Sequence, residues 1–235
     1  MKILAFDSTA SVASVAVCED EKLLALFNID NGLTQSELLL PMAEDALKAL
    51  KLSFSDIELF CCSTGPGSFT GVRIGASLVK GLAFGRDIPC LGISTLEALA
   101  QNLFPLKGYI LPCMDARRAQ VYNAVFYSDG VTLKRITEDR AISLLELCSE
   151  ARTLEGDVYL CGDGYSVTKA AFEKADVAFK ETPSILITQN AYSVAKAAYR
   201  RFLSGERQSD LELCATYLRM PQAERERLER LNKKD

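Results

Sequence analysis

The sequence contains no histidine and no tryptophan among its 235 residues. The absence of histidine removes the commonest metal ligand in proteins and the commonest general base near neutral pH. It excludes a Ser-His-Asp triad, a Cys-His dyad and a His-Glu-x-x-His zinc site. Metalloproteases and hydrolases of these types are therefore ruled out for this chain.

Long apolar runs and an excess of positive charge are also missing. No run approaches the ~18 apolar residues of a membrane-spanning helix, and the opening "MKILAFDST" has no signal-peptide pattern. The net charge is −4 and the pI is about 5.2, which disfavours tight binding to nucleic acid by this chain alone. We expect a soluble, cytoplasmic protein with no membrane partner.

Cysteine is plentiful but is not arranged for metal binding. None of the eight cysteines forms a C-x-x-C pair, and most lie in apolar runs such as "ELFCCST". Free cysteine behaves as a small buried hydrophobe. We therefore predict reduced core thiols rather than disulfides or zinc ligands.

The predicted elements follow the order strand-strand-strand-helix-strand-helix, and this order occurs twice. Asp7 and Asp115 end the first strand of each half, in "KILAFDST" and "GYILPCMDAR". This repeat of organisation predicts two similar α/β lobes, with two unrelated α/β lobes as the alternative. A later amphipathic stretch, "NAYSVAKAAYRRFLSG", predicts a helix closed by Gly205. The chain ends in the charged stretch "QAERERLERLNKKD".

Three helical patterns begin with a Ser or Thr followed three residues later by Glu, the spacing of a capping box. These pairs are Thr34 and Glu37, Ser94 and Glu97, and Ser143 and Glu146. Pro41 lies inside the first pattern, where we expect it to kink the helix or to restart it.

The helical stretch "FTGVRIGASLVKGLAFG" contains unusually many glycines, namely Gly71, Gly75, Gly81 and Gly85. Even with the last as a C-cap, the others together cost roughly 3 kcal/mol relative to alanine, against a typical net stability of ~5–15 kcal/mol. Glycines on one face let another backbone come close. That neighbour is either the chain's own sheet or helix, or a helix of another chain.

The turn before this helix, in "STGPGSFTG" at residues 63–71, has the composition of a phosphate-binding turn. Its two glycines permit positive φ, and Ser68 is a good N-cap. It matches neither a Walker A motif nor G-x-G-x-x-G, so a purely structural turn is the competing interpretation. The candidate cofactor-binding residues are Asp7, Ser8, Gly65, Gly67 and Ser68.

Five stretches together resemble the bacterial TsaB (YeaZ) family: "KILAFDST", "STGPGSFTGVRIG", "GLAFG" with "IPCLGISTLEALA", "DARRAQVYNAVF" and "TYLR". The resemblance implies an α/β protein with the duplicated actin-like ATPase (ASKHA) fold, in which each of two lobes has a mixed sheet flanked by helices. We expect an N-terminal lobe at residues 1–104, a C-terminal lobe at 105–208, and a segment at 209–235 that packs back on the first lobe.

The same resemblance implies a function in making N6-threonylcarbamoyladenosine at position 37 of tRNAs that read codons beginning with A. The family looks like a non-catalytic paralogue and partner of the transferase TsaD, joined in a larger complex by the ATPase TsaE. tRNA would be the substrate of the complex. Alone, family members form homodimers through the helical face of the first lobe.

The sequence departs from active members of the fold in ways that fit a non-catalytic role. Gln35 stands where many relatives keep a single histidine, and no metal site is expected. The hairpin at Asp7 to Ala10 lacks the glycine of the Asp-x-Gly-Thr motif of active members, so we expect no cofactor of its own and ATP or ADP only in the complex. An Asp7 that caps a turn is favoured over one that orients a ligand. An autonomous ATP-binding or ATP-hydrolysing enzyme is the alternative, and a plain homodimeric scaffold is another.

The two helical stretches of the first lobe are predicted to form a helical bundle with the same two helices of TsaD, because they carry more apolar residues than one buried face needs. The candidate partner-binding residues are Leu38, Leu40, Met42, Gly71, Gly75, Leu78 and Leu82. The sequence assigns no role to Asp115. It offers Arg117 and Arg118 as candidate tRNA contacts, or as ordinary solvated charges, and Tyr217 and Arg219 as anchors of the last segment.

Overall fold

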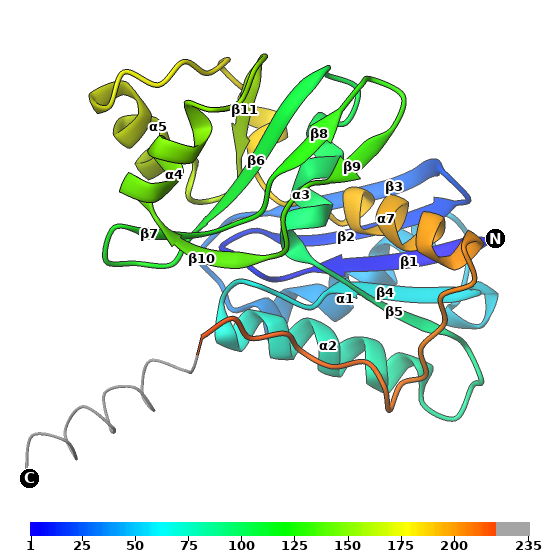
Figure 1. Cartoon of the computed structure of the whole chain (residues 1–235). Coiled ribbons are helices and arrows are strands. Elements are labelled where there is room, and N and C mark those ends of the chain that lie inside the picture. Colours follow the sequence, from blue (N-terminus) through cyan, green and yellow to red (C-terminus); the bar gives the residue numbers. More distant parts are fainter. Residues whose placement is uncertain (220–235) are drawn as a thin grey trace, which may run out of the picture.

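A computed structural model describes residues 1–219, which form two β-sheets with helices packed against them (Figure 1). The first sheet has the strand order β3-β2-β1-β4-β5. Its central strand β1 pairs antiparallel with β2 and parallel with β4. The strands are β1 (Lys2–Asp7), β2 (Ala13–Glu19), β3 (Lys22–Ile29), β4 (Leu59–Ser63) and β5 (Cys90–Ile93).

Helices cover both faces of the first sheet (Figure 1). On one face α1 (Gln35–Ala49) and α2 (Phe69–Ala83) pack into a core with Leu4, Phe6 and Phe60. On the other face α7 (Ala191–Leu203) packs against Ile3 and Leu59. Because β4 is buried along its whole length, its sequence is a continuous apolar run rather than an alternating one.

The second sheet repeats this arrangement around β6, which pairs antiparallel with β7 and parallel with β11, as β1 does with β2 and β4. Its strands are β6 (Gly108–Asp115), β7 (Gln120–Asn123), β8 (Phe126–Ser128), β9 (Leu133–Arg135), β10 (Arg140–Ser143) and β11 (Val158–Cys161). The remaining helices are η1 (Phe54–Asp56), α3 (Thr95–Leu103), α4 (Leu144–Ala151), α5 (Tyr165–Lys174) and α6 (Ser184–Ile187). The strand-helix pattern from α4 onward repeats as predicted, but five strands (β6 to β10) precede α4 where the sequence predicts three.

The stretch "AQVYNAVFYSDG" at 119–130, whose apolar pattern predicts one strand of the second lobe, is divided into β7 and β8. Both parts pair with β6, but β10 lies outside β7 and β9 lies outside β8. At the change of partner, Val125 receives hydrogen bonds at its carbonyl oxygen from the backbone of Ile136 and Thr137. These contacts take the place of regular pairing, so the strand is interrupted there.

The predicted helix starts are present in the structure. Thr34 and Glu37 form a complete capping box at α1, as do Ser143 and Glu146 at α4. Ser94 accepts a hydrogen bond from the backbone of Glu97 at α3. Pro41 does not restart α1, which runs through it to Ala49.

The two lobes are not two consecutive halves of the chain. Helix α7, which the sequence places in the second lobe, packs on the first sheet, because its Ala191, Val194 and Ala198 are buried against that sheet. Helix α3 lies between the two sheets, with Leu96 and Leu103 packed on the second. Residues 208–219 run back along the first lobe, and the expected segment beyond them, 220–235, lies outside the described residues.

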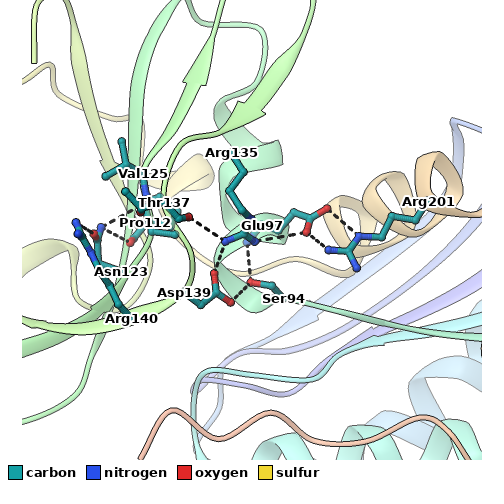
Figure 2. A network of polar contacts seen from close by, with 11 residues as sticks. Ser94, Glu97, Pro112, Asn123, Val125, Arg135, Thr137, Asp139, Arg140 and Arg201 are labelled. Carbon is teal, nitrogen blue, oxygen red and sulfur yellow. Dashed lines mark hydrogen bonds and ion pairs between the residues drawn. The ribbon is translucent and has the colours of Figure 1, made fainter. Parts of the chain in front are cut away.

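A polar network joins the two lobes (Figure 2). The Glu97 carboxylate of α3 lies 3.5 Å from the Arg135 guanidinium of β9 and accepts hydrogen bonds from Arg201 of α7. Arg135 also pairs with Asp139 at 2.5 Å, and Asp139 accepts a 2.5 Å hydrogen bond from Ser94. We call these five residues the lobe latch, since they fix the loop between β9 and β10 to the helices of the first lobe.

The cysteines are placed as the sequence predicts, with one exception. All eight are free, and seven of them are buried. Burial raises the pKa of the Cys18 and Cys113 thiols to about 12. Only Cys214 is exposed.

Candidate functional site

A cleft of about 560 Å³ lies between the two lobes. Its first-lobe wall is made by the hairpin after β1 and the turn before α2. Its second-lobe wall is made by the ends of β6 and β11. Residues 208–219, which we call the C-terminal strap, supply one edge of the cleft through Thr216, Tyr217, Leu218 and Arg219.

Asp7 does not face this cleft. It is 1% exposed, and its carboxylate accepts hydrogen bonds from the Ser63 hydroxyl at 2.6 Å and from the backbone and hydroxyl of Thr9 at 2.9 and 2.7 Å. Burial raises the pKa of the Asp7 carboxyl, and these three hydrogen bonds oppose that shift. Asp7 therefore closes its own hairpin, as the turn-capping interpretation expects.

Ser8 is also directed into the protein. Its hydroxyl donates a 2.8 Å hydrogen bond to the carbonyl oxygen of Gly71 on α2. A Cβ at Gly71 would overlap the Ser8 carbonyl oxygen, and one at Gly75 would lie 2.7 Å from the Ser8 hydroxyl. The close approach that these two glycines permit is thus to the chain's own hairpin.

The turn at residues 65–68 packs against the same chain. Gly65 has φ +111°, and a Cβ there would overlap the Thr216 carbonyl oxygen of the strap. A Cβ at Gly67 would lie 2.5 Å from the carbonyl oxygen of Thr9, which also accepts the Ser68 N–H at 2.8 Å. Gly67 and Ser68 line the cleft, and Ser68 caps α2 by accepting the N–H of Gly71.

The second-lobe wall of the cleft is acidic. The backbone N–H of Asp115 donates to the Asp163 carboxylate at 3.0 Å. Burial, together with the negative charge of Asp115, raises the pKa of the Asp163 carboxyl. Arg117 forms a 3.1 Å ion pair with Asp115, and its side chain is 84% exposed. The sequence could have indicated Asp163, because it follows a buried strand in "VYLCGD" as Asp7 and Asp115 follow theirs.

The C-terminal strap connects both lobes, which gives the "TYLR" stretch a position. The Thr216 N–H donates to the Thr64 carbonyl oxygen at 2.7 Å. The Tyr217 ring lies 4.9 Å from the Phe69 ring at the start of α2. Arg219 reaches the second lobe, where it donates to the Ala116 carbonyl oxygen at 3.0 Å.

A second cavity, an apolar groove of about 520 Å³, lies between α1 and α2 on the outside of the first lobe. We call it the α1–α2 groove. Its lining residues are Ser36, Leu39, Leu40, Phe69, Thr70, Arg73, Ile74, Ser77 and Leu78. Leu40 is 38% exposed. An open apolar groove of this kind is typical of a surface that receives a helix.

Only some of the predicted partner-binding residues line this groove. Leu40 and Leu78 line it, and Leu38 and Leu82 are partly buried against the first core. Met42, Gly71 and Gly75 are buried and face inward, which corrects their assignment to an outer surface. Helical periodicity puts Leu39, Met42 and Ala43 on the sheet side of α1.

The described residues offer no cluster suited to a metal ion. Within residues 1–219, no group of three or more Cys, Asp or Glu side chains is placed to hold one. Gln35 instead donates 2.8 and 2.9 Å hydrogen bonds to the carbonyl oxygens of Ala10 and Ser11. It therefore fixes the hairpin after β1. No helix in the part of the chain described here is long and apolar enough to cross a membrane.

Two lobes with one repeated order of strands and helices, facing each other across a cleft, define the actin-like ATPase class of fold. The family model described as "TsaD: tRNA N6-adenosine threonylcarbamoyltransferase" matches residues 34–226. The tRNA threonylcarbamoyladenosine biosynthesis protein TsaB of Escherichia coli K12 is 34% identical over 168 residues, which are 70% of this chain and 72% of that protein. The chain belongs to the TsaB (YeaZ) family.

Two further comparisons extend over nearly the whole chain. TsaB of Haemophilus influenzae is 28% identical over 227 residues, covering 93% of this chain and 94% of that protein. The solved structure of YeaZ from Pseudomonas aeruginosa superposes with a TM-score of 0.73 at 22% identity, covering 92% of this chain and 99% of that one. The predicted fold is confirmed by this likeness.

Proposed function

We propose that this chain is a non-catalytic partner subunit of a TsaD-type transferase in the formation of N6-threonylcarbamoyladenosine at position 37 of tRNAs that read codons beginning with A. The transferase docks on the α1–α2 groove. A TsaE-type ATPase completes a larger complex that acts on tRNA, and the free subunit pairs with a second copy of itself. The names of the relatives and of the family model support the pathway.

The observation that carries this proposal is the contrast between the two cavities. Among the described residues, the α1–α2 groove presents apolar side chains such as Leu40, Ile74 and Leu78 at the surface, where a partner would cover them. The side chains at the start of the hairpin that would hold a phosphate in an active relative make hydrogen bonds within the chain. The Asp7 carboxylate accepts three, from Ser63 and Thr9.

Autonomous ATP hydrolysis is the second candidate, and the first-lobe residues fit it poorly. The Ser68 N–H already donates to Thr9, and the Ser8 hydroxyl to Gly71. A phosphate could accept hydrogen bonds from the Ser68 N–H and the Ser8 hydroxyl only by displacing these two bonds. ATP turnover by the isolated chain, abolished in Asp7→Ala, would support this candidate instead.

The test is a binding measurement with the transferase. The TsaD-type protein of the same organism is titrated with the wild-type chain and with Leu78→Glu, which places a charge in the α1–α2 groove. We expect a one-to-one complex with the wild type and a loss of at least tenfold in affinity for Leu78→Glu, since ~1.4 kcal/mol is tenfold. Leu145→Glu is the matched control, because Leu145 is 78% exposed on α4 of the other lobe. Failure of the wild type to bind would refute the proposal.

A further inference from the structure

Arg73 is the single charged side chain among the described residues that line the α1–α2 groove. It lies on the exposed side of α2, one turn after Phe69. Its neighbours in the groove are aliphatic, aromatic or hydroxyl side chains. A cation in this position loses water when a partner covers the groove, and an uncompensated charge there is costly.

The guanidinium of Arg73 is held in place by two neutral aromatic rings. Its central carbon lies 3.7 Å from the centre of the Phe69 ring. Its Nε donates a 2.9 Å hydrogen bond to the Tyr217 hydroxyl. The Phe69 and Tyr217 rings also contact each other, at 4.9 Å between centres. The strap therefore reaches the docking surface through Tyr217.

Within the described part of the chain, the two terminal amino groups of Arg73 have no hydrogen-bond partner. Among residues 1–219, no carboxylate lies within the 4.0 Å ion-pair limit of Arg73, and its one hydrogen bond is made through Nε. A guanidinium fixed in this way can present a planar pair of donors, which matches the two oxygens of a carboxylate. Because the rings order the side chain beforehand, binding sacrifices little rotamer freedom.

We propose that Arg73 is the anchor of the partner interface and binds a carboxylate on the docking helix of the transferase, with Tyr217 as the residue that positions it. This inference rests on the proposed function and adds the chemistry of recognition. An aliphatic groove with one ordered arginine at its edge selects an apolar helix that carries an Asp or Glu at the matching position. The strap thereby contributes to docking without touching the partner's apolar face.

The experiment measures the affinity of the full chain for the TsaD-type transferase of the same organism, at low and high salt. Arg73→Ala should weaken binding at least tenfold, as expected for a hot-spot arginine, and should flatten the salt dependence. Arg73→Lys should lose nearly as much, since an ammonium cannot replace the planar fork. Lys80→Ala is the matched control: it removes one positive charge from the same helix outside the groove, and should change affinity less than about twofold.

The Tyr217→Phe variant tests the positioning of Arg73 while the positive charge of Arg73 is kept. This variant keeps the ring on Phe69 and loses only the hydroxyl that receives the Arg73 hydrogen bond. We expect a loss of about threefold in affinity, smaller than the ~1.5–3 kcal/mol of a hydrogen bond that involves a charged group, because Phe69 still holds the guanidinium. The salt dependence should be unchanged. A thermal melt identical to wild type shows that the fold is intact.

The outcomes separate this inference from the function on which it rests. If the wild type does not bind the transferase, the proposed function fails and the inference fails with it. If the wild type binds and Arg73→Ala binds as well as Lys80→Ala does, the function stands and the inference is overturned. A loss in Arg73→Ala confined to pairing of the chain with itself also overturns it.

Discussion

The Ser8 hydroxyl donates a 2.8 Å hydrogen bond to the Gly71 carbonyl oxygen. The backbone of Ser8 lies so close to Gly71 that a Cβ on Gly71 would overlap the Ser8 carbonyl oxygen. This contact joins the hairpin after β1 to the first turn of α2. It explains one glycine of a helix that should otherwise avoid glycine. Gly81, by contrast, has no atom from elsewhere in residues 1–219 within 4 Å of the position of a Cβ.

Two alanine substitutions on α2 should therefore have opposite effects. Gly71→Ala should lower the free energy of unfolding by about 2 kcal/mol, because the hairpin must move away. Gly81→Ala should raise it by about 0.5–1 kcal/mol, because alanine loses less backbone entropy in an exposed helix. Urea denaturation followed by circular dichroism measures both. Equal effects of the two substitutions would contradict this account of Gly71.

Asp7 should make stability fall as pH rises. Burial raises its pKa above the usual 3.8, so the folded state holds the proton more tightly than the unfolded state. Its contribution is fully present below pH 3.8 and is lost as pH rises through the raised pKa. Asp7→Asn cannot ionise, so its stability relative to wild type should increase from pH 4 to pH 8.

The same titration of Asp45→Asn controls for net charge, since Asp45 is exposed on α1. Free energies of unfolding at several pH values give both curves. A stability difference for Asp7→Asn that does not change with pH would show that the Asp7 carboxyl has the same pKa in both states.

Thiol reactivity should be confined to Cys214. At pH 8 and under native conditions a disulfide reagent should modify one cysteine per chain, and none rapidly in Cys214→Ser, because the other seven thiols are buried. Counting released chromophore before and after denaturation checks this. Rapid reaction of a second thiol in the folded state would be inconsistent with the burial described here.

The buried thiols also predict alkaline destabilisation. Desolvation raises the pKa of Cys18 and Cys113 from 9.0 to about 12. Their contribution is therefore complete below pH 9 and is lost as pH rises toward 12. Cys18→Ala and Cys113→Ala should each reduce the loss of stability between pH 9 and pH 10.5, measured by urea denaturation.

The lobe latch should matter more than an ordinary surface ion pair. Glu97 is 16% exposed and Arg135 is 24% exposed in their side chains. Glu97→Gln leaves two arginines facing a neutral group and should cost about 1–3 kcal/mol of stability. Lys180→Ala, which breaks an exposed pair with Asp157, should cost less than about 1 kcal/mol. Thermal or urea unfolding measures the stability of both variants. Equal losses of stability in the two would refute a stabilising role of the lobe latch.

Local features were predictable from the sequence because their causes are local. The capping pairs that start α1, α3 and α4 lie within four residues of each other, so the spacing alone identifies the helix starts. Strand β4 is a short apolar run because it is buried on both faces. The repeat was inferred by identifying such segments one after another along the chain. The interruption at Val125 was missed, because it depends on a change of neighbouring strand.

The candidate site was predictable only in part. Ser68 is the N-cap that its position suggests, and Gly67 lines the cleft. Met42 was assigned to the outer surface, although helical periodicity groups it with Leu39 on the sheet side of α1, and it faces the core. Arg73 gave no signal beyond its place in a motif, because its partners Phe69 and Tyr217 are joined to it only by folding.

The sequence by itself determined most helices, most strands, the buried thiols and the lack of a histidine-based site, since each rests on composition or on short-range spacing. Its motifs carried the resemblance to the family. Only the tertiary structure decided what Gly65 and Gly71 face, where α7 packs and what the strap touches. Those outcomes depend on contacts such as that of Tyr217 with Arg73, 144 residues apart in the chain. Contacts at such separations form when apolar surfaces on distant segments are buried together, and no local pattern encodes their pairing.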